Sequence, residues 1–98
     1  MAYEIFFSEI AEENQLAFLN HYFQISPKIA SKFLEEVDII VELIKENPFL
    51  FGVRYKDIRI ANIKKFKTQV CYRIDQQNKA VIVYTIVRSE RNPDRYLE

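Results

Sequence analysis

The spacing of the apolar residues changes near the middle of this chain, and that change constrains the fold most strongly. Before residue 47 the apolar residues recur at intervals of three and four, which places them on one side of a helix. After residue 57 they alternate with polar residues, as in a β-strand with one buried face. A helical half followed by a stranded half predicts an α+β domain.

The best-marked helix of the first half begins at Ser26-Pro27. Proline fits the first helical position, and the serine before it can cap the helix. The helix is expected to end at Asn47-Pro48, because proline disfavours helical geometry in the residue before it. Its apolar side has i, i+3, i+4 and i+7 spacing and consists of Ala30, Phe33, Leu34, Val37, Ile40, Val41 and Ile44.

A short strand and another helix are predicted ahead of Ser26. Residues 3–7 are rich in β-prone side chains. Ser8 follows as the N-cap of a helix that continues through Gln24. Because about two residues join this helix to the next, we expect the two to pack antiparallel as a helical hairpin.

Three strands are predicted in the second half, around residues 58–61, 69–74 and 79–88. The last is apolar on both faces, which is typical of a central strand, and residues 75–78 form a hairpin loop before it. The predicted order is therefore β-α-α-β-β-β in a single domain over residues 1–98. The helical hairpin is expected to pack on one face of a small, antiparallel-rich sheet.

The residue counts exclude several kinds of site. One cysteine excludes an intrachain disulfide, and one histidine beside it argues against a zinc site. One glycine excludes a glycine loop that cradles phosphates, so we expect no metal and no cofactor. We interpret His21 as an ordinary surface or half-buried side chain and Cys71 as a small buried hydrophobe.

The chain is expected to be cytoplasmic and not to contact a membrane. Its longest apolar stretch is far shorter than the ~20 residues that a membrane-spanning helix needs. The first residues carry acidic side chains where a signal peptide carries lysine or arginine.

The neutral net charge conceals a division along the chain. Residues 1–50 contain three basic and nine acidic side chains, whereas residues 51–98 contain eleven basic and five acidic ones. Such asymmetry is typical of a surface that binds a polyanion or an acidic partner, and the alternative is that the two halves neutralise each other. The basic residues are Arg54, Lys56, Arg59, Lys64, Lys65, Lys67, Arg73, Lys79, Arg88, Arg91 and Arg95.

Aromatic residues lie among these cations, as in proteins that bind RNA or single-stranded nucleic acid. In the predicted strands, Arg59, Arg73, Gln69 and Cys71 all stand at positions that alternate with the apolar residues. We therefore expect both arginines on the sheet face that the helices leave open. The alternative is a solvated strand face whose charges protect against edge pairing.

Elements spread over nearly the whole chain resemble the RelE/ParE toxins of bacterial type II toxin–antitoxin modules, also called plasmid stabilisation proteins. The resemblance lies in the order and spacing of these elements rather than in any one of them. They are Ser8, Ala11, Pro27, Ala30, Phe33, Asn47-Pro48, Tyr55, residues 57–59, residues 66–75 and residues 87–93.

This resemblance implies a toxin that inhibits growth and is held inactive by a cognate antitoxin. RelE-like members cleave mRNA in the ribosomal A site, using basic residues to orient the RNA and stabilise charge. ParE-like members poison DNA gyrase and are not known as hydrolases. A third alternative is an inactive member that only binds its antitoxin.

Departures from the nuclease pattern favour the ParE-like alternative. RelE-like nucleases place an arginine three residues before the strand tyrosine, where this chain has Gln69. Lys67-Thr68 stands where family members usually have Pro-Tyr. Ribosome-dependent nucleases of the family are strongly basic, whereas this chain has an isoelectric point of about 6.6. Loss of a cation that stabilises a developing phosphorane charge lowers the rate by orders of magnitude.

The functional surface is predicted to contain four arginines, which are Arg59, Arg73, Arg88 and Arg91. These cations would face a nucleic acid, a gyrase subunit or the antitoxin. If the chain is a nuclease, Lys64, Lys65 and Arg91 would orient phosphates and Tyr96 would transfer a proton.

Overall fold

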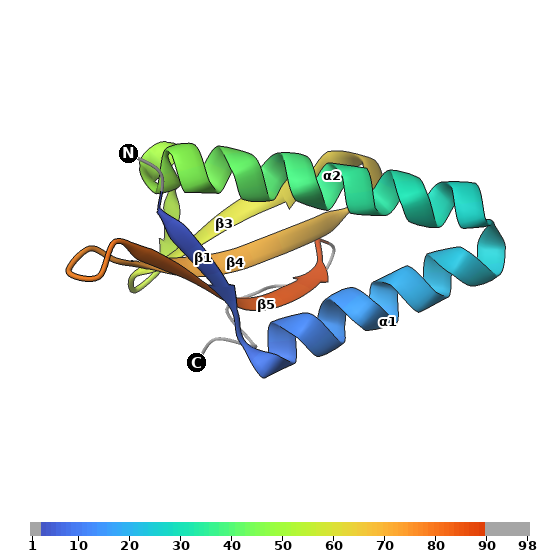
Figure 1. Cartoon of the computed structure of the whole chain (residues 1–98), viewed down its shortest axis with the longest axis horizontal. Helices are drawn as coiled ribbons and strands as arrows, with labels where there is room; N and C mark the ends of the chain where they lie inside the picture. Colours follow the sequence, from blue (N-terminus) through green and yellow to red (C-terminus); the bar gives the residue numbers. More distant parts are fainter. Residues whose placement is uncertain (1–2, 90–98) are drawn as a thin grey trace.

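The computed structural model describes residues 3–89, which form two helices against a five-stranded sheet (Figure 1). The elements in chain order are β1 (Glu4–Phe7), α1 (Glu9–Ile25), α2 (Pro27–Glu46), the 3-10 turn η1 (Pro48–Leu50), β2 (Val53–Tyr55), β3 (Ile58–Ile63), the 3-10 turn η2 (Lys64–Phe66), β4 (Thr68–Asp75) and β5 (Ala80–Arg88). The predicted α+β class and helical hairpin are confirmed.

The helix boundaries follow the capping residues read from the sequence. The Ser8 hydroxyl accepts a hydrogen bond from the backbone N–H of Ala11 at 3.0 Å, which caps α1. The Ser26 hydroxyl accepts from the backbone N–H of Lys28 at 3.2 Å, with proline at the start of α2. Figure 1 shows the two helices meeting at this turn and diverging toward the end where β1 crosses between them.

The sheet has the strand order β1-β5-β4-β3-β2. Only the pair of β1 with β5 is parallel, so the sheet is rich in antiparallel pairs, as predicted. β5 lies between β1 and β4 and is a central strand, which explains why its sequence is apolar on both faces. β2 was not predicted, because three residues, the middle one Arg54, show no alternating pattern.

The main core lies between the helices and one face of the sheet. Phe33 of α2 is fully buried, and its ring packs against those of Phe18, Tyr22 and Phe66 at centroid distances of 5.9, 5.1 and 5.3 Å. Tyr72 of β4 is also fully buried, and its hydroxyl donates to the Pro48 carbonyl at 2.6 Å. This bond satisfies a polar group that would be costly to bury alone.

Within residues 3–89, no helix has both the length and the apolar character needed to cross a membrane.

Candidate functional site

A groove of about 890 Å³ lies between one side of α1, residues 55–58 at the β2–β3 turn, and residues 84–88 of β5. From α1 it is lined by Ile10, Asn14 and Phe18, whose spacing of four puts them on the same side of the helix. Its size and mixed aromatic, apolar and charged lining are those of a binding cleft.

Side chains of α1 fasten the helix along β5 and thereby fix this groove. β1 pairs with only the first half of β5, which would leave the second half as an open edge. The Ser8 hydroxyl donates to the Tyr84 carbonyl at 2.8 Å. The Asn14 side-chain oxygen accepts from the Ile86 backbone N–H at 3.0 Å and from the Thr85 hydroxyl at 2.7 Å. These hydrogen bonds from α1 and its N-cap thus cover the edge of β5 that β1 leaves unpaired.

Two of the predicted arginines lie at this groove. Arg88 lines it, and its guanidinium carbon is 5.8 Å from the centroid of the Phe18 ring. Arg73 borders it, with its guanidinium carbon 6.0 Å from the centroid of Tyr84, which is a lining residue. These distances allow cation–π attraction. The aromatic rings therefore hold the two cations at the groove, where they can meet an anionic partner.

Arg59 does not share a sheet face with Arg73, so that prediction is wrong. Arg59 is paired in register with Tyr72, which belongs to the core on the helix side. Adjacent residues of a strand point to opposite faces, so Arg73 lies on the other side. The Arg59 guanidinium donates to the Phe51 carbonyl at 2.7 Å and lies 5.1 Å from the centroid of Phe49.

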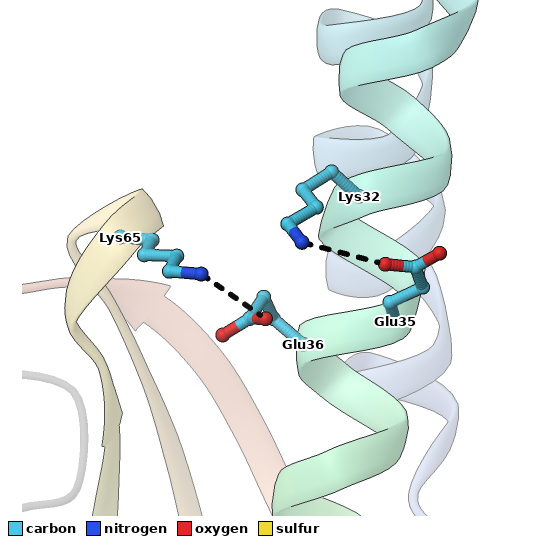
Figure 2. Close-up of polar contacts among 4 residues, drawn as sticks. All are labelled: Lys32, Glu35, Glu36 and Lys65. Atoms are coloured by element: carbon cyan, nitrogen blue, oxygen red, sulfur yellow. Dashed lines mark ion pairs between the residues drawn. The ribbon is translucent and has the colours of Figure 1, made fainter.

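The nuclease candidates Lys64 and Lys65 lie in η2 and do not line the groove. Figure 2 shows Lys65 pointing toward Glu36 of α2, with 3.8 Å between its ammonium nitrogen and a carboxylate oxygen. In the same view Lys32 pairs with Glu35 within α2 at 3.6 Å. Lys65 is thus engaged with the helical hairpin. Arg91 and Tyr96 lie outside the described residues.

The sheet face away from the helices has a small apolar cluster at its centre, which we call the far-face cluster. It consists of Ile58, Ile60 and Cys71, which are buried, with Val87 packed against them. Burial raises the pKa of the Cys71 thiol to about 11, so the thiol is protonated and unreactive at neutral pH. The interpretation of Cys71 as a buried hydrophobe is confirmed.

Two polar atoms on this face have no hydrogen-bond partner in the described part of the chain. They are the side-chain oxygen of Gln69 and the Nε atom of Arg73, both on β4. Gln69 is 7% exposed, although polar atoms at that depth are normally paired. Residues 3–89 therefore leave part of the hydrogen-bonding capacity of this face unsatisfied.

Sequence reasoning missed Asn14, because an asparagine inside a helix gives no sign of the strand it will meet. It also missed Tyr84 as the ring that lies against Arg73. The one available signal was the spacing of residues 10, 14, 18 and 21, which marks one side of the first helix. His21 is exposed on that side, as expected.

Residues 3–89 contain no group of three or more His, Cys, Asp or Glu side chains that could hold a metal ion.

Solved structures share this fold. A chain of the chromosomal ParDE toxin–antitoxin system from P. aeruginosa superposes with a TM-score of 0.73 and 16% identity, over 89% of this chain and 96% of that one. A chain of a RelBE toxin–antitoxin complex from Mycobacterium tuberculosis gives 0.62 and 15%, over 90% and 99%. The isolated E. coli RelE toxin gives 0.59 and 17%, over 98% and 94%.

No protein-family model matches the chain, and no curated protein matches it in sequence. At these identities the structural likeness shows a shared fold, and fold alone does not fix function.

Proposed function

We propose that this chain is a cytoplasmic toxin of a bacterial type II toxin–antitoxin module and that it acts on DNA gyrase, as ParE-like toxins do, without cleaving RNA. The fold shared with ParDE and RelBE proteins supports the toxin assignment. The observation that favours gyrase is the far-face cluster, which surrounds the position of Gln69 with apolar side chains, where the RelE-like pattern has an arginine.

The chemistry of RNA cleavage explains why this cluster matters. Attack of a 2′-hydroxyl on phosphate builds negative charge, and one lost stabilising donor costs about 10²–10³ in rate. Gln69, which stands where the nucleases have arginine, is neutral and almost fully buried. The cations at the groove, Arg73 and Arg88, lie against aromatic rings at its border. This arrangement favours recognition of a partner over catalysis.

The proposed antitoxin would bind as an amphipathic segment with acidic residues. The groove offers apolar surface from Ile10, which is 60% exposed, and from Tyr84, which is 41% exposed. Lys56 and Arg88 add positive charge. An apolar strip rimmed by cations fits a helix laid into a groove, with its acidic side chains toward the rim.

Controlled induction of the chain in a bacterial culture tests the toxin assignment. We expect growth arrest that co-expression of the neighbouring antitoxin gene relieves. DNA breaks or lost supercoiling should appear while translation continues, and purified gyrase should lose supercoiling activity when the purified chain is added. Early translation arrest with cuts at codon positions in mRNA would favour the RelE-like alternative. Normal growth with folded protein would favour an inactive antitoxin-binding member.

Substitution of Arg73 tests whether the groove carries the activity. We expect Arg73→Ala to abolish toxicity with little change in the thermal unfolding midpoint, since a partly exposed cation–π contact contributes about 0.5–1 kcal/mol. Arg54→Ala is the matched control, because Arg54 is exposed on β2 and does not line the groove. Full toxicity of folded Arg73→Ala would remove this arginine from the site.

A further inference from the structure

The sheet face away from the helices carries apolar side chains outside the groove and outside the far-face cluster. The residues on either side of Phe6 in β1, and on either side of Ile82 in β5, pack in the core on the helix side. Because adjacent residues of a strand point to opposite faces, Phe6 and Ile82 lie on the far face. Phe6 is 51% exposed and Ile82 is half-buried, so this part of the face is only partly covered.

The strand register joins these two residues to Arg73. Phe6 is the register partner of Ile82 in the parallel pair of β1 and β5, and Ile82 is the partner of Arg73 in the antiparallel pair of β5 and β4. Phe6, Ile82 and Arg73 therefore form one line across three neighbouring strands, which we call the far-face row. Tyr84, which is 41% exposed and lines the groove, contacts the Arg73 guanidinium with its ring. The far-face row is thus continuous with the groove.

Arg73 keeps its hydrogen-bonding capacity for a partner. Its side chain is half-buried, yet among residues 3–89 it takes part in no ion pair, and its Nε atom has no hydrogen-bond partner. A guanidinium has five N–H donors and matches a carboxylate in a bidentate arrangement. The apolar side chains beside it lower the local dielectric constant, which strengthens such a contact.

A line of opposite charge runs next to the far-face row. Glu4 of β1 and Asp75 of β4 are both register partners of Ala80 in β5, two residues along each strand from the row. They lie on the same face, about 7 Å from the row. Neither carboxylate takes part in an ion pair among residues 3–89. Hydrogen bonds from Asn78 lower the pKa of Asp75, and the charge of Arg73 contributes to this shift.

This order of charges selects the kind of partner. A nucleic acid is negative along its whole length, so Glu4 and Asp75 would repel it beside Arg73. A protein segment can present an acidic and a basic side chain about 7 Å apart, with an apolar side chain between them. On the basis of the proposed function, we propose that the antitoxin segment in the groove continues over the far-face row. Its carboxylate meets Arg73, its apolar side chain covers Phe6, and its basic side chain faces Glu4 and Asp75.

Calorimetric titration of the purified full chain with the purified product of the neighbouring antitoxin gene tests the apolar contact. Phe6→Ser should raise the dissociation constant about tenfold, because the partner loses the apolar surface that it covers. Phe23→Ser is the matched control, since Phe23 is 59% exposed on α1 and does not line the groove. Circular dichroism and the thermal unfolding midpoint show that each variant is folded.

A charge exchange tests the contact with Arg73. Arg73→Glu should raise the dissociation constant about a hundredfold, because it places two carboxylates against each other. Arg54→Glu, on exposed β2 outside the groove, is its control. Each acidic residue of the antitoxin is then replaced in turn by lysine. One of these replacements should weaken binding to the parent chain and restore binding to the Arg73→Glu variant.

The proposal is wrong if no complex forms, or if folded Phe6→Ser binds no more weakly than Phe23→Ser. It is also wrong if no lysine replacement restores binding to Arg73→Glu. These measurements use purified proteins and do not depend on growth arrest. A chain that arrests growth and binds its antitoxin without the far-face row would overturn this proposal and leave the toxin assignment intact. A chain that shows the charge rescue without arresting growth would do the reverse.

Discussion

The two faces of the sheet differ in the size of the apolar clusters that they carry. On the helix side, both helices and η2 contribute aromatic rings to one continuous core. On the other side, residues 3–89 form the smaller far-face cluster, and beside it two polar atoms of β4 have no hydrogen-bond partner among these residues. A large aromatic core therefore holds the two helices on one face, whereas the cluster on the other face is small and lies beside unsatisfied polar atoms.

The largest expected effect comes from the same truncation on opposite faces of β3. Ile63 belongs to the core and Ile60 to the far-face cluster. We expect Ile63→Ala to lower the free energy of unfolding by about 4 kcal/mol and Ile60→Ala by about 2 kcal/mol, since fewer atoms surround the second cavity. Urea unfolding measures both losses. Equal losses would show that the far-face cluster stabilises the fold as much as the core does.

A smaller effect should appear at alkaline pH, where adjacent residues of β4 report on the two faces. Burial raises the pKa of Cys71 to about 11 and that of Tyr72 to about 12, the latter despite the opposing charge of Arg59. Because both groups keep their protons longer when folded, stability should fall from about pH 9 for the thiol and from about pH 10 for the phenol. The thiol contribution amounts to about 3 kcal/mol, and most of it is lost by pH 11.

Cys71→Ala separates the two contributions. The variant loses some packing at all pH values, but its stability should stay level until about pH 10, where the Tyr72 phenol begins to ionise in the unfolded chain while it keeps its proton in the folded one. The unfolding midpoint measured from pH 8 to pH 11 gives both profiles, so the slopes can be compared directly. Identical slopes in the variant and the parent chain would show that the thiol is not shielded on the far face.

The smallest effect is expected at the ion pair between η2 and α2. Lys65 is 63% exposed, so its pairing with Glu36 should contribute about 0.5 kcal/mol, and less at high salt. A double-mutant cycle with Lys65→Ala and Glu36→Ala measures this coupling. A coupling above about 1.5 kcal/mol would mean that η2 is held by charge as well as by the packing of Phe66.

The sequence predicts the fold well where local signals are strong. Ser8, Ser26-Pro27 and Asn47 mark the helix ends because capping is a local interaction. The relative faces of two strands are not local, since they depend on the register set by the turn between them. The turn at residues 64–67, with Lys67 in a left-handed conformation, sets Arg59 opposite Tyr72 in the sheet. Odd numbering alone therefore did not place Arg59 on the same face as Arg73. The groove could not be predicted from the sequence, because its lining comes from three segments that are distant along the chain.

The parallel pairing of β1 with β5 has a consequence for the order in which the fold is completed. Residues 4–7 pair with residues 80–83, and α1 is fastened to the same strand. A chain leaving the ribosome therefore makes β1 and α1 long before their shared neighbour. The helical hairpin can form from nearby contacts, whereas closing the sheet must await the last strand. We expect nascent chains that stop before β5 to lack the groove altogether.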